Sequence, residues 1–242
     1  YKTLENGDSL ALHIFKPRNM QAGEKRPVIV YFFGGGWKLG TPLQFYRECA
    51  YYASKGMVAV SVDYRIEYLH HSTPFDSFED AKDAICWLRS HASDYQLDPD
   101  KIAVAGGSAG GHLAAALGTI GSDEAVNYRP NLSVLYYPVV DMVSRGYGFP
   151  EIKRDFEKIS PIHHVSEATP STLILLGMKD PIVSVETIRS YQDKLLQKGV
   201  DCELHLFGGA GHPIFLYRKP LTEDYYKVRK LTDDFLKREG FL

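Results

Sequence analysis

Five continuous apolar runs recur along the chain, and amphipathic stretches separate them. The runs show no alternation of apolar with polar residues: 26–33, 57–65, 101–107, 132–140 and 171–177. This is the pattern of a strand buried on both faces. The stretches between them carry apolar residues at helical spacing: 42–56, 77–95, 184–199 and 222–240. Strands that alternate with helices predict an α/β fold, with a mostly parallel central sheet and helices on both of its faces.

The organisation of the chain is that of one domain over residues 1–242. The 242 residues are 44% hydrophobic and 24% charged, which is typical of one globular domain of this size. Asn6-Gly7 predicts a hairpin turn near the start, and Ser77 followed by Asp80 predicts a helix that begins at Ser77. The segment 141–166 has charges and prolines but no strand pattern. It is either a lid or cap insertion that shapes the site, or a peripheral loop with one or two short helices.

Composition excludes several function classes. A formal net charge of −2 provides no basic surface for nucleic acid, and no apolar run approaches the ~18 residues of a membrane span. Three scattered cysteines are too few for a disulfide framework or a zinc site, and we expect no metal and no cofactor. The chain begins at Tyr1 rather than at methionine, so an upstream segment, such as a signal peptide or a neighbouring domain, is expected to have been removed. If it was a signal peptide, the protein is secreted or periplasmic.

A cluster of glycines surrounds one serine where an apolar run meets a helix-forming stretch. Residues 106–110, Gly-Gly-Ser-Ala-Gly, fit G-x-S-x-G, the pattern of a nucleophile elbow. Such a turn is sharp and strained, and bulky flanking residues would collide with the strand and the helix. It lifts the Ser108 hydroxyl to the carboxyl edge of the sheet, with the Ala109 N–H beside it.

A second glycine cluster follows the first buried run. Gly34, Gly35 and Gly36 stand where an esterase or lipase carries its oxyanion loop. A phosphate-binding loop is excluded, because Thr41 stands where the lysine of that motif is needed.

A serine nucleophile needs a general base and a carboxylate that orients it. In this fold class these follow in the order Ser, Asp or Glu, His. Asp180 lies just past a buried run and His212 lies in a later glycine-rich loop, so both are expected at the sheet edge that carries Ser108. Asp141, after the run 132–140, is an alternative acid. Asp63 is interpreted instead as a partner of Arg65.

The other histidines fit catalysis less well. His112 follows Ser108 by four residues and is expected to turn away from its hydroxyl, towards packing or a hydrogen bond. His205 lies inside a predicted strand. The pairs 70–71 and 163–164 lie on loops without the further ligands of a metal site.

The chain resembles the α/β-hydrolases, and more narrowly the esterase/lipase group with an HGGG-type oxyanion loop, which includes hormone-sensitive-lipase-like and bacterial feruloyl- and acetyl-esterase-like proteins. The resemblance rests on "FFGGGW", "VSVDYR", "SPIHHV", "LLGMKDPIV" and "GGAGH" in the family's order, and above all on the block from "DAICWLR" to "GGSAGGHLAA". One departure is that Phe33 replaces the histidine that usually opens the loop. Phenylalanine can hold the loop by packing only, which affects its rigidity and the substrate preference.

The resemblance implies a serine carboxylesterase in which Ser108 attacks the ester, His212 takes the proton and Asp180 holds the imidazole. The oxyanion would accept hydrogen bonds from the N–H groups of Gly34, Gly35 and Ala109.

The resemblance also bears on the substrate. The family's long N-terminal cap is not seen, which favours an open site, and small acyl groups on a plant polysaccharide rather than long acyl chains. Trp37 and Tyr137 are candidate substrate-binding residues, whereas Tyr64 is expected in the core. The alternatives are an amide or peptide hydrolase, such as a formamidase or a prolyl-peptidase-like enzyme, and an inactive hydrolase fold that serves as a binding module.

Overall fold

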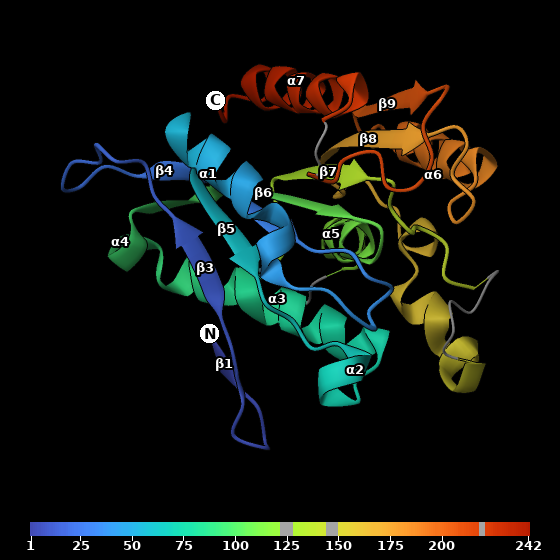
Figure 1. Cartoon of the computed structure of the whole chain (residues 1–242), viewed down its shortest axis with the longest axis horizontal. Coiled ribbons are helices and arrows are strands. Elements are labelled where there is room, and N and C mark those ends of the chain that lie inside the picture. Colours follow the sequence, from blue (N-terminus) through green and yellow to red (C-terminus); the bar gives the residue numbers. More distant parts are fainter. Residues whose placement is uncertain (122–127, 144–149, 218–220) are drawn as a thin grey trace.

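A seven-stranded sheet forms the centre of the molecule (Figure 1). The structure is a computed structural model that describes residues 1–121, 128–143, 150–217 and 221–242, without the side chains of 150–154. In spatial order, the strands are β3 (Leu12–Phe15), β5 (Val58–Val62), β4 (Arg26–Phe32), β6 (Leu97–Gly107), β7 (Leu132–Tyr136), β8 (Ser171–Gly177) and β9 (Cys202–Phe207). Only β3 is antiparallel to its neighbour, so the predicted α/β fold with a mostly parallel sheet is confirmed.

The register of the sheet aligns the ends of its central strands. Phe32 at the end of β4 pairs with Val62 of β5 and with Gly106 of β6. Tyr136 of β7 pairs in turn with Gly107. The segments that follow these strands therefore leave the sheet at one edge, where ligands bind in folds of this kind.

A short hairpin precedes the sheet. Its strands β1 (Lys2–Thr3) and β2 (Ser9–Leu10) are antiparallel, and the turn between them contains Asn6-Gly7 as predicted. The chain then enters the main sheet as β3, whose role as an antiparallel edge strand was not anticipated.

Helices cover both faces of the sheet. They are η1 (Pro42–Phe45), α1 (Tyr46–Ser54), α2 (Glu67–His70), α3 (Pro74–Ser90), α4 (Ala92–Tyr95), α5 (Ala109–Thr119), η2 (Pro150–Ile159), η3 (Pro161–His163), α6 (Val185–Gln197) and α7 (Glu223–Arg238). Helices α3 and α5 pack together on one face. On the other, α1 and α7 are joined by a hydrogen bond of 2.5 Å from Tyr51 to Asp233. No helix in the described ranges is both long and apolar enough to cross a bilayer.

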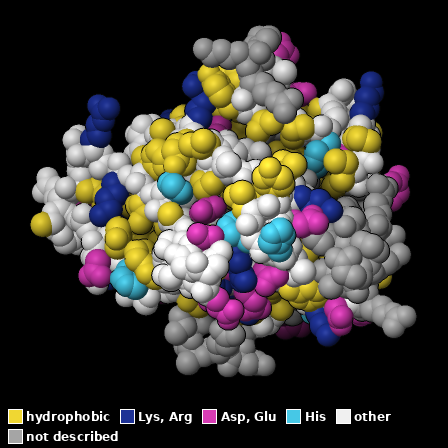
Figure 2. All heavy atoms as spheres, turned by 60° about the horizontal axis from the view of Figure 1, so that its bottom comes forward, with side chains coloured by type: hydrophobic (Ala, Val, Ile, Leu, Met, Phe, Trp, Pro, Cys, Tyr) yellow, Lys and Arg dark blue, Asp and Glu magenta, His cyan; other side chains and the backbone are white. Residues whose placement is uncertain are grey.

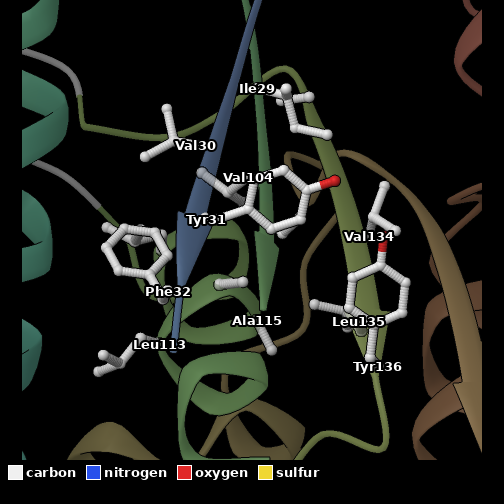
Figure 3. Close-up of a cluster of buried hydrophobic side chains, with 14 of the residues drawn as sticks. Ile29, Val30, Tyr31, Phe32, Val104, Leu113, Ala115, Val134, Leu135 and Tyr136 are labelled. Carbon is white, nitrogen blue, oxygen red and sulfur yellow. The ribbon is translucent and has the colours of Figure 1, made fainter. Parts of the chain in front are cut away.

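The core lies on both sides of β4 (Figure 3). Val30 and Phe32 project to one side, towards Leu113 of α5, and Ile29 and Tyr31 project to the other. The Tyr31 ring stacks on Phe45, with ring centroids 4.8 Å apart. All these side chains are almost completely buried, which explains why the sequence of this strand is apolar without alternation.

The helix predicted to begin at Ser77 begins one turn earlier. Thr73 is the N-cap of α3, and its side chain and backbone form a capping box with Asp76. Ser77 lies inside the helix, where its hydroxyl donates to the Arg65 carbonyl. Thr73 with Asp76 and Ser77 with Asp80 both have the spacing of a capping box. Pro74 distinguishes them, because proline is favoured at the first helical position.

The predicted pairing of Asp63 with Arg65 is wrong. The Arg65 guanidinium donates two hydrogen bonds of 2.8 Å to Asp80, whose carboxylate is fully buried. Asp80 also accepts a hydrogen bond of 2.7 Å from Lys2. The carboxylate on α3 therefore ties the first strand of the chain to the segment after β5.

The segment 141–166 lies partly outside the described residues, which omit 144–149. Where it is described, it forms η2 and η3 and contains no strand, as expected from its pattern. The side chain of Phe156 is fully buried, and its ring stacks on that of Phe75 in α3 with the ring centroids 6.4 Å apart. This part is packed against the domain. That the segment acts as a lid or cap stays a prediction.

We expect Gly110→Ala to destabilise the fold by about 3 kcal/mol, the upper end of the usual cost of overpacking, because a methyl group there would lie 2.0 Å from the Phe32 carbonyl oxygen. The matched control is Gly208→Ala, where a methyl group meets no atom within 4 Å. Urea denaturation measures both variants. Equal stability of the two would show that α5 does not need this close approach.

Candidate active site

Ser108 occupies the sharp turn between β6 and α5. Its backbone has φ 56° and ψ −119°, and residues other than glycine rarely adopt such a positive φ. Its N–H donates to the Tyr136 carbonyl on β7. Glycines surround it because no larger residue fits: a methyl group on Gly106 would lie 2.3 Å from the Gly110 carbonyl oxygen. The predicted elbow is thus present, with its strain.

The three predicted triad residues come together at this edge of the sheet. His212 Nε2 lies 3.0 Å from Ser108 Oγ, and His212 Nδ1 lies 2.7 Å from Asp180 Oδ2. Asp180 follows β8 and His212 follows β9, as the chain order predicts. The Asp180 side chain is fully buried and the imidazole is 11% exposed.

Hydrogen bonds hold the Asp180 carboxyl in its charged form. Burial acts to raise its pKa, but the hydrogen bonds from His212 and from two backbone N–H groups outweigh burial, and the pKa is lowered from its ordinary value. Those two groups belong to Ile182 and Val183, which donate to Oδ1 at 2.8 and 2.9 Å. A carboxylate only accepts, so Nδ1 of a neutral His212 carries the proton and Nε2 is free to accept from Ser108.

The glycine loop after β4 lies against the elbow. A methyl group on Gly34 would lie 2.7 Å from the Gly107 carbonyl oxygen and 3.3 Å from Ser108 Cβ. Within the described chain, the N–H groups of Gly35 and Ala109 donate to no protein acceptor. They are two of the three donors expected at the oxyanion position.

The third expected donor is engaged elsewhere. The Gly34 N–H donates to the side-chain oxygen of Gln44, on η1, at 2.6 Å. In this structure the Gly34 donor is therefore not available to a substrate, in contrast to the expectation from the sequence. Gln44 was missed because nothing in its sequence neighbourhood marks it. Only the fold of residues 34–45 brings its amide back to the loop.

Phe33 is held by more than packing. Its ring stacks on Tyr64 with centroids 4.0 Å apart and an interplanar angle of 13°, and the Tyr64 hydroxyl donates to the Phe33 carbonyl at 2.6 Å. Tyr64 is fully buried, as expected. Together with Gln44, this tyrosine anchors the loop that lacks the usual histidine.

His112 turns away from Ser108, as predicted, and links three parts of the site. It is fully buried, its Nε2 lies 2.7 Å from the Ile159 carbonyl oxygen of η2, and its ring meets the edge of Trp37 at 5.1 Å. Burial lowers its pKa to about 4, so the ring is neutral near pH 7. Since a carbonyl only accepts, the proton of this neutral ring lies on Nε2.

A cavity of about 560 Å³ opens at Ser108. Its polar lining includes Ser108, His212, Gln44 and the loop glycines. Trp37 and Tyr137, the candidate substrate-binding residues, both line it although they are almost completely buried. The sequence did not identify the remaining apolar lining: Leu39, Val139, Ile182, Pro213 and Leu216.

The rival candidates lie outside this constellation. Asp141, the alternative acid, accepts a hydrogen bond from the Val143 N–H and not from His212. His205 lies on β9, 3.1 Å from the Glu203 carboxylate. Across the described ranges, no three His, Cys, Asp or Glu side chains are grouped as metal ligands would be, and none of the three cysteines forms a disulfide.

The sheet is mostly parallel, the serine elbow follows the central strand β6, and Asp180 and His212 follow β8 and β9. These features define the class: the fold is that of an α/β-hydrolase. The profile of the BD-FAE family matches residues 12–148, more than half of the chain. The chain belongs to this family of α/β-hydrolase esterases.

Known proteins agree with this assignment. A thermophilic esterase from Thermogutta terrifontis, Est2, is 37% identical, with a TM-score of 0.92 over 100% of this chain and 91% of that one. It has also been solved with propionate or butyrate bound and phosphorylated by paraoxon.

Two curated relatives are longer than this chain. Esterase LipC from Mycobacterium tuberculosis is 30% identical over 76% of this chain and 51% of its own length. An acetylxylan esterase from Xylanibacter ruminicola is 25% identical over 79% of this chain and 42% of its own length. The chain thus spans about half the length of the curated relatives it matches.

We expect Gln44→Met to lower kcat by about tenfold with a smaller change in KM. Methionine matches the length of glutamine but removes the acceptor of the Gly34 N–H. The variant frees this donor for the oxyanion, but we expect the loss of the anchor, about 1–3 kcal/mol, to loosen the loop and to outweigh that gain. Steady-state hydrolysis of p-nitrophenyl acetate measures the effect, with Leu43→Gln at the exposed neighbouring position as control. An unchanged kcat in Gln44→Met would contradict the anchoring role.

We expect stability to fall as the pH is lowered from about 6.5 to about 4, because the unfolded chain then binds a proton at residue 112 that the folded chain excludes. Relative to His112→Gln, the wild type should lose roughly 2–3 kcal/mol between pH 7 and pH 4.5. Urea denaturation at both values checks this, and exposed His163→Gln should keep the wild-type slope. Parallel pH profiles for the wild type and His112→Gln would refute the prediction.

Proposed function

We propose that the protein is a serine carboxylesterase that hydrolyses short acyl esters through an acyl-enzyme. The observation that carries this proposal is the unbroken hydrogen-bonded chain from Asp180 through His212 to Ser108, which ends in a cavity beside two open backbone donors. A degenerate fold used only for binding would have no need of this alignment.

The first half of the reaction follows from the geometry. His212 Nε2 takes the proton from Ser108 Oγ while that oxygen attacks the ester carbonyl carbon, and the Asp180 carboxylate stabilises the resulting imidazolium. The N–H groups of Gly35 and Ala109 donate to the oxyanion of the tetrahedral intermediate. When the intermediate collapses, His212 gives its proton to the departing alcohol oxygen and the acyl group stays on Ser108.

Water completes the reaction. His212 Nε2 accepts a proton from a water molecule as the water oxygen attacks the acyl carbon. When this second intermediate collapses, His212 returns the proton to Ser108 Oγ, the acid leaves and the Ser108 hydroxyl is restored. The Gly34 N–H joins the other donors only if the Gln44 side chain moves aside.

The acyl group is short in this proposal. Trp37, Tyr137 and Val139 contribute apolar surface to the cavity around Ser108, against which a short alkyl group can pack. Binding of propionate and butyrate by the Thermogutta esterase supports the same size range.

The alcohol in this proposal is a carbohydrate, as in an acetylated plant polysaccharide. The acetylxylan esterase among the relatives supports this choice. An amide or peptide substrate is the competing outcome, because the same triad cleaves both kinds of bond.

We expect Ser108→Ala to lose at least about 10⁴-fold in kcat on p-nitrophenyl acetate, since the triad acts as a unit. An organophosphate such as paraoxon should phosphorylate the wild type and not the variant, as intact-mass spectrometry would show. Ser54→Ala, at an exposed serine, serves as control. Undiminished hydrolysis by Ser108→Ala would refute the proposal.

The hydrolysis assay also tests the substrate class when the acyl group and the leaving group are varied. p-Nitrophenyl acetate, propionate, butyrate and octanoate compare acyl length, and acetylated xylan, an N-formyl amide and a dipeptide compare the leaving group. A higher kcat/KM for the amide or the dipeptide would replace the esterase assignment by an amidase.

A further inference from the structure

A second hollow adjoins the catalytic cavity. It has a volume of about 520 Å³ and is lined by Lys38, Leu39, Glu67, Tyr68 and His71. Leu39 lines both spaces, so one exposed side chain forms the wall between them. An ester whose acyl group enters at Ser108 must extend its alcohol portion out of the first cavity, and the hollow lies on the other side of Leu39.

Backbone hydrogen bonds fix the hollow to the glycine loop. The Glu67 N–H donates to the Trp37 carbonyl at 2.9 Å, and the Tyr68 N–H donates to the Lys38 carbonyl at 3.1 Å. Lys38 and Glu67 also form an ion pair of 3.0 Å. Helix α2, which follows β5 beyond the sheet edge, is therefore docked on the loop that carries the oxyanion donors (Figure 1).

Tyr68 leaves a large aromatic surface open to solvent. It is 81% exposed, more than any other large hydrophobic residue in the described part of the chain. Within that part its ring contacts no other aromatic ring and its hydroxyl has no hydrogen-bond partner. A ring that is held by its backbone but uncovered on its face is suited to stacking against a ligand.

The lining combines the apolar surface of Leu39 and Tyr68 with three polar side chains, which suits a sugar because its ring has apolar faces and hydroxyl groups at its edge. Lys38, Glu67 and His71 supply charged or imidazole donors and acceptors for hydroxyl groups, whereas an alkyl chain would desolvate them without compensation. Figure 2 turns the lower side of Figure 1, where α2 lies, towards the viewer, and there hydrophobic side chains lie among acidic and histidine side chains.

We propose that this hollow binds the sugar of the leaving alcohol, with the Tyr68 ring against one face of a pyranose and with Lys38, Glu67 and His71 bonded to its hydroxyl groups. This inference rests on the proposed esterase function and assigns the alcohol side of the same site. In this proposal Tyr68 determines which alcohol is bound, whereas Ser108 and His212 carry out the hydrolysis.

The test compares two substrates in one variant. We expect Tyr68→Ala to lower the ratio of kcat/KM for an acetylated xylo-oligosaccharide to kcat/KM for p-nitrophenyl acetate by about tenfold or more, because only the first substrate reaches the ring. Tyr68→Phe should keep the ratio within about threefold, since the face of the ring is retained. Tyr226→Ala, at a 56% exposed tyrosine on α7, is the matched control and should leave the ratio unchanged. An unchanged ratio in Tyr68→Ala would overturn the proposal.

A binding measurement separates this proposal from the esterase assignment. Titration calorimetry of unsubstituted xylo-oligosaccharide into the Ser108→Ala protein needs no catalysis. We expect binding that weakens about tenfold when Tyr68→Ala is added. No binding at millimolar oligosaccharide, or equal affinity in both proteins, would reject the sugar site even if ester hydrolysis is confirmed. If the wild type hydrolyses no ester but oligosaccharide binding still depends on Tyr68, the esterase function is rejected and the sugar site is kept.

Discussion

The direct approach of backbone to backbone around Ser108 is the constraint on which the rest of the site depends. Gly110 on α5 leaves no room for a methyl group beside the carbonyl oxygens of Phe32 and Phe33, and Gly34 leaves none beside Gly107. The Ser108 turn and the glycine loop are thus positioned against each other without an intervening side chain. Because no rotamer separates them, their relative placement is as rigid as the sheet itself, which catalysis by positioned groups requires.

Much of this arrangement could be predicted from the sequence, because it follows from chain order. A buried parallel strand has an apolar sequence on both faces, and the segment after each such strand emerges at one edge. Asp180 and His212 follow strands in this way, so residues 72 and 32 positions apart (108 to 180, and 180 to 212) were expected to meet, and they do. Their catalytic roles stay a proposal.

The features that the sequence did not predict depend on side chains meeting across the fold. The sequence favours Asp63 as the partner of Arg65 because it lies only two residues away, but the Arg65 guanidinium donates two hydrogen bonds to the buried Asp80 on the following helix and two more to Asp76. Gln44 reaches Gly34 only because η1 turns back under the loop. Such contacts depend on tertiary packing, so the spacing of residues in the sequence does not predict them.

The docking of α2 on the glycine loop has a consequence for how such an enzyme can diversify. Two backbone hydrogen bonds join Glu67 and Tyr68 to Trp37 and Lys38, so an insertion or deletion in either segment would shift the other. If α2 binds the alcohol as proposed, selection for a new alcohol can proceed by exchanging side chains on α2, whereas a change in the length of α2 would shift the glycine loop. In a lineage with this architecture, turnover would be inherited as a fixed trait, and substrate range would drift through point substitutions at the rim.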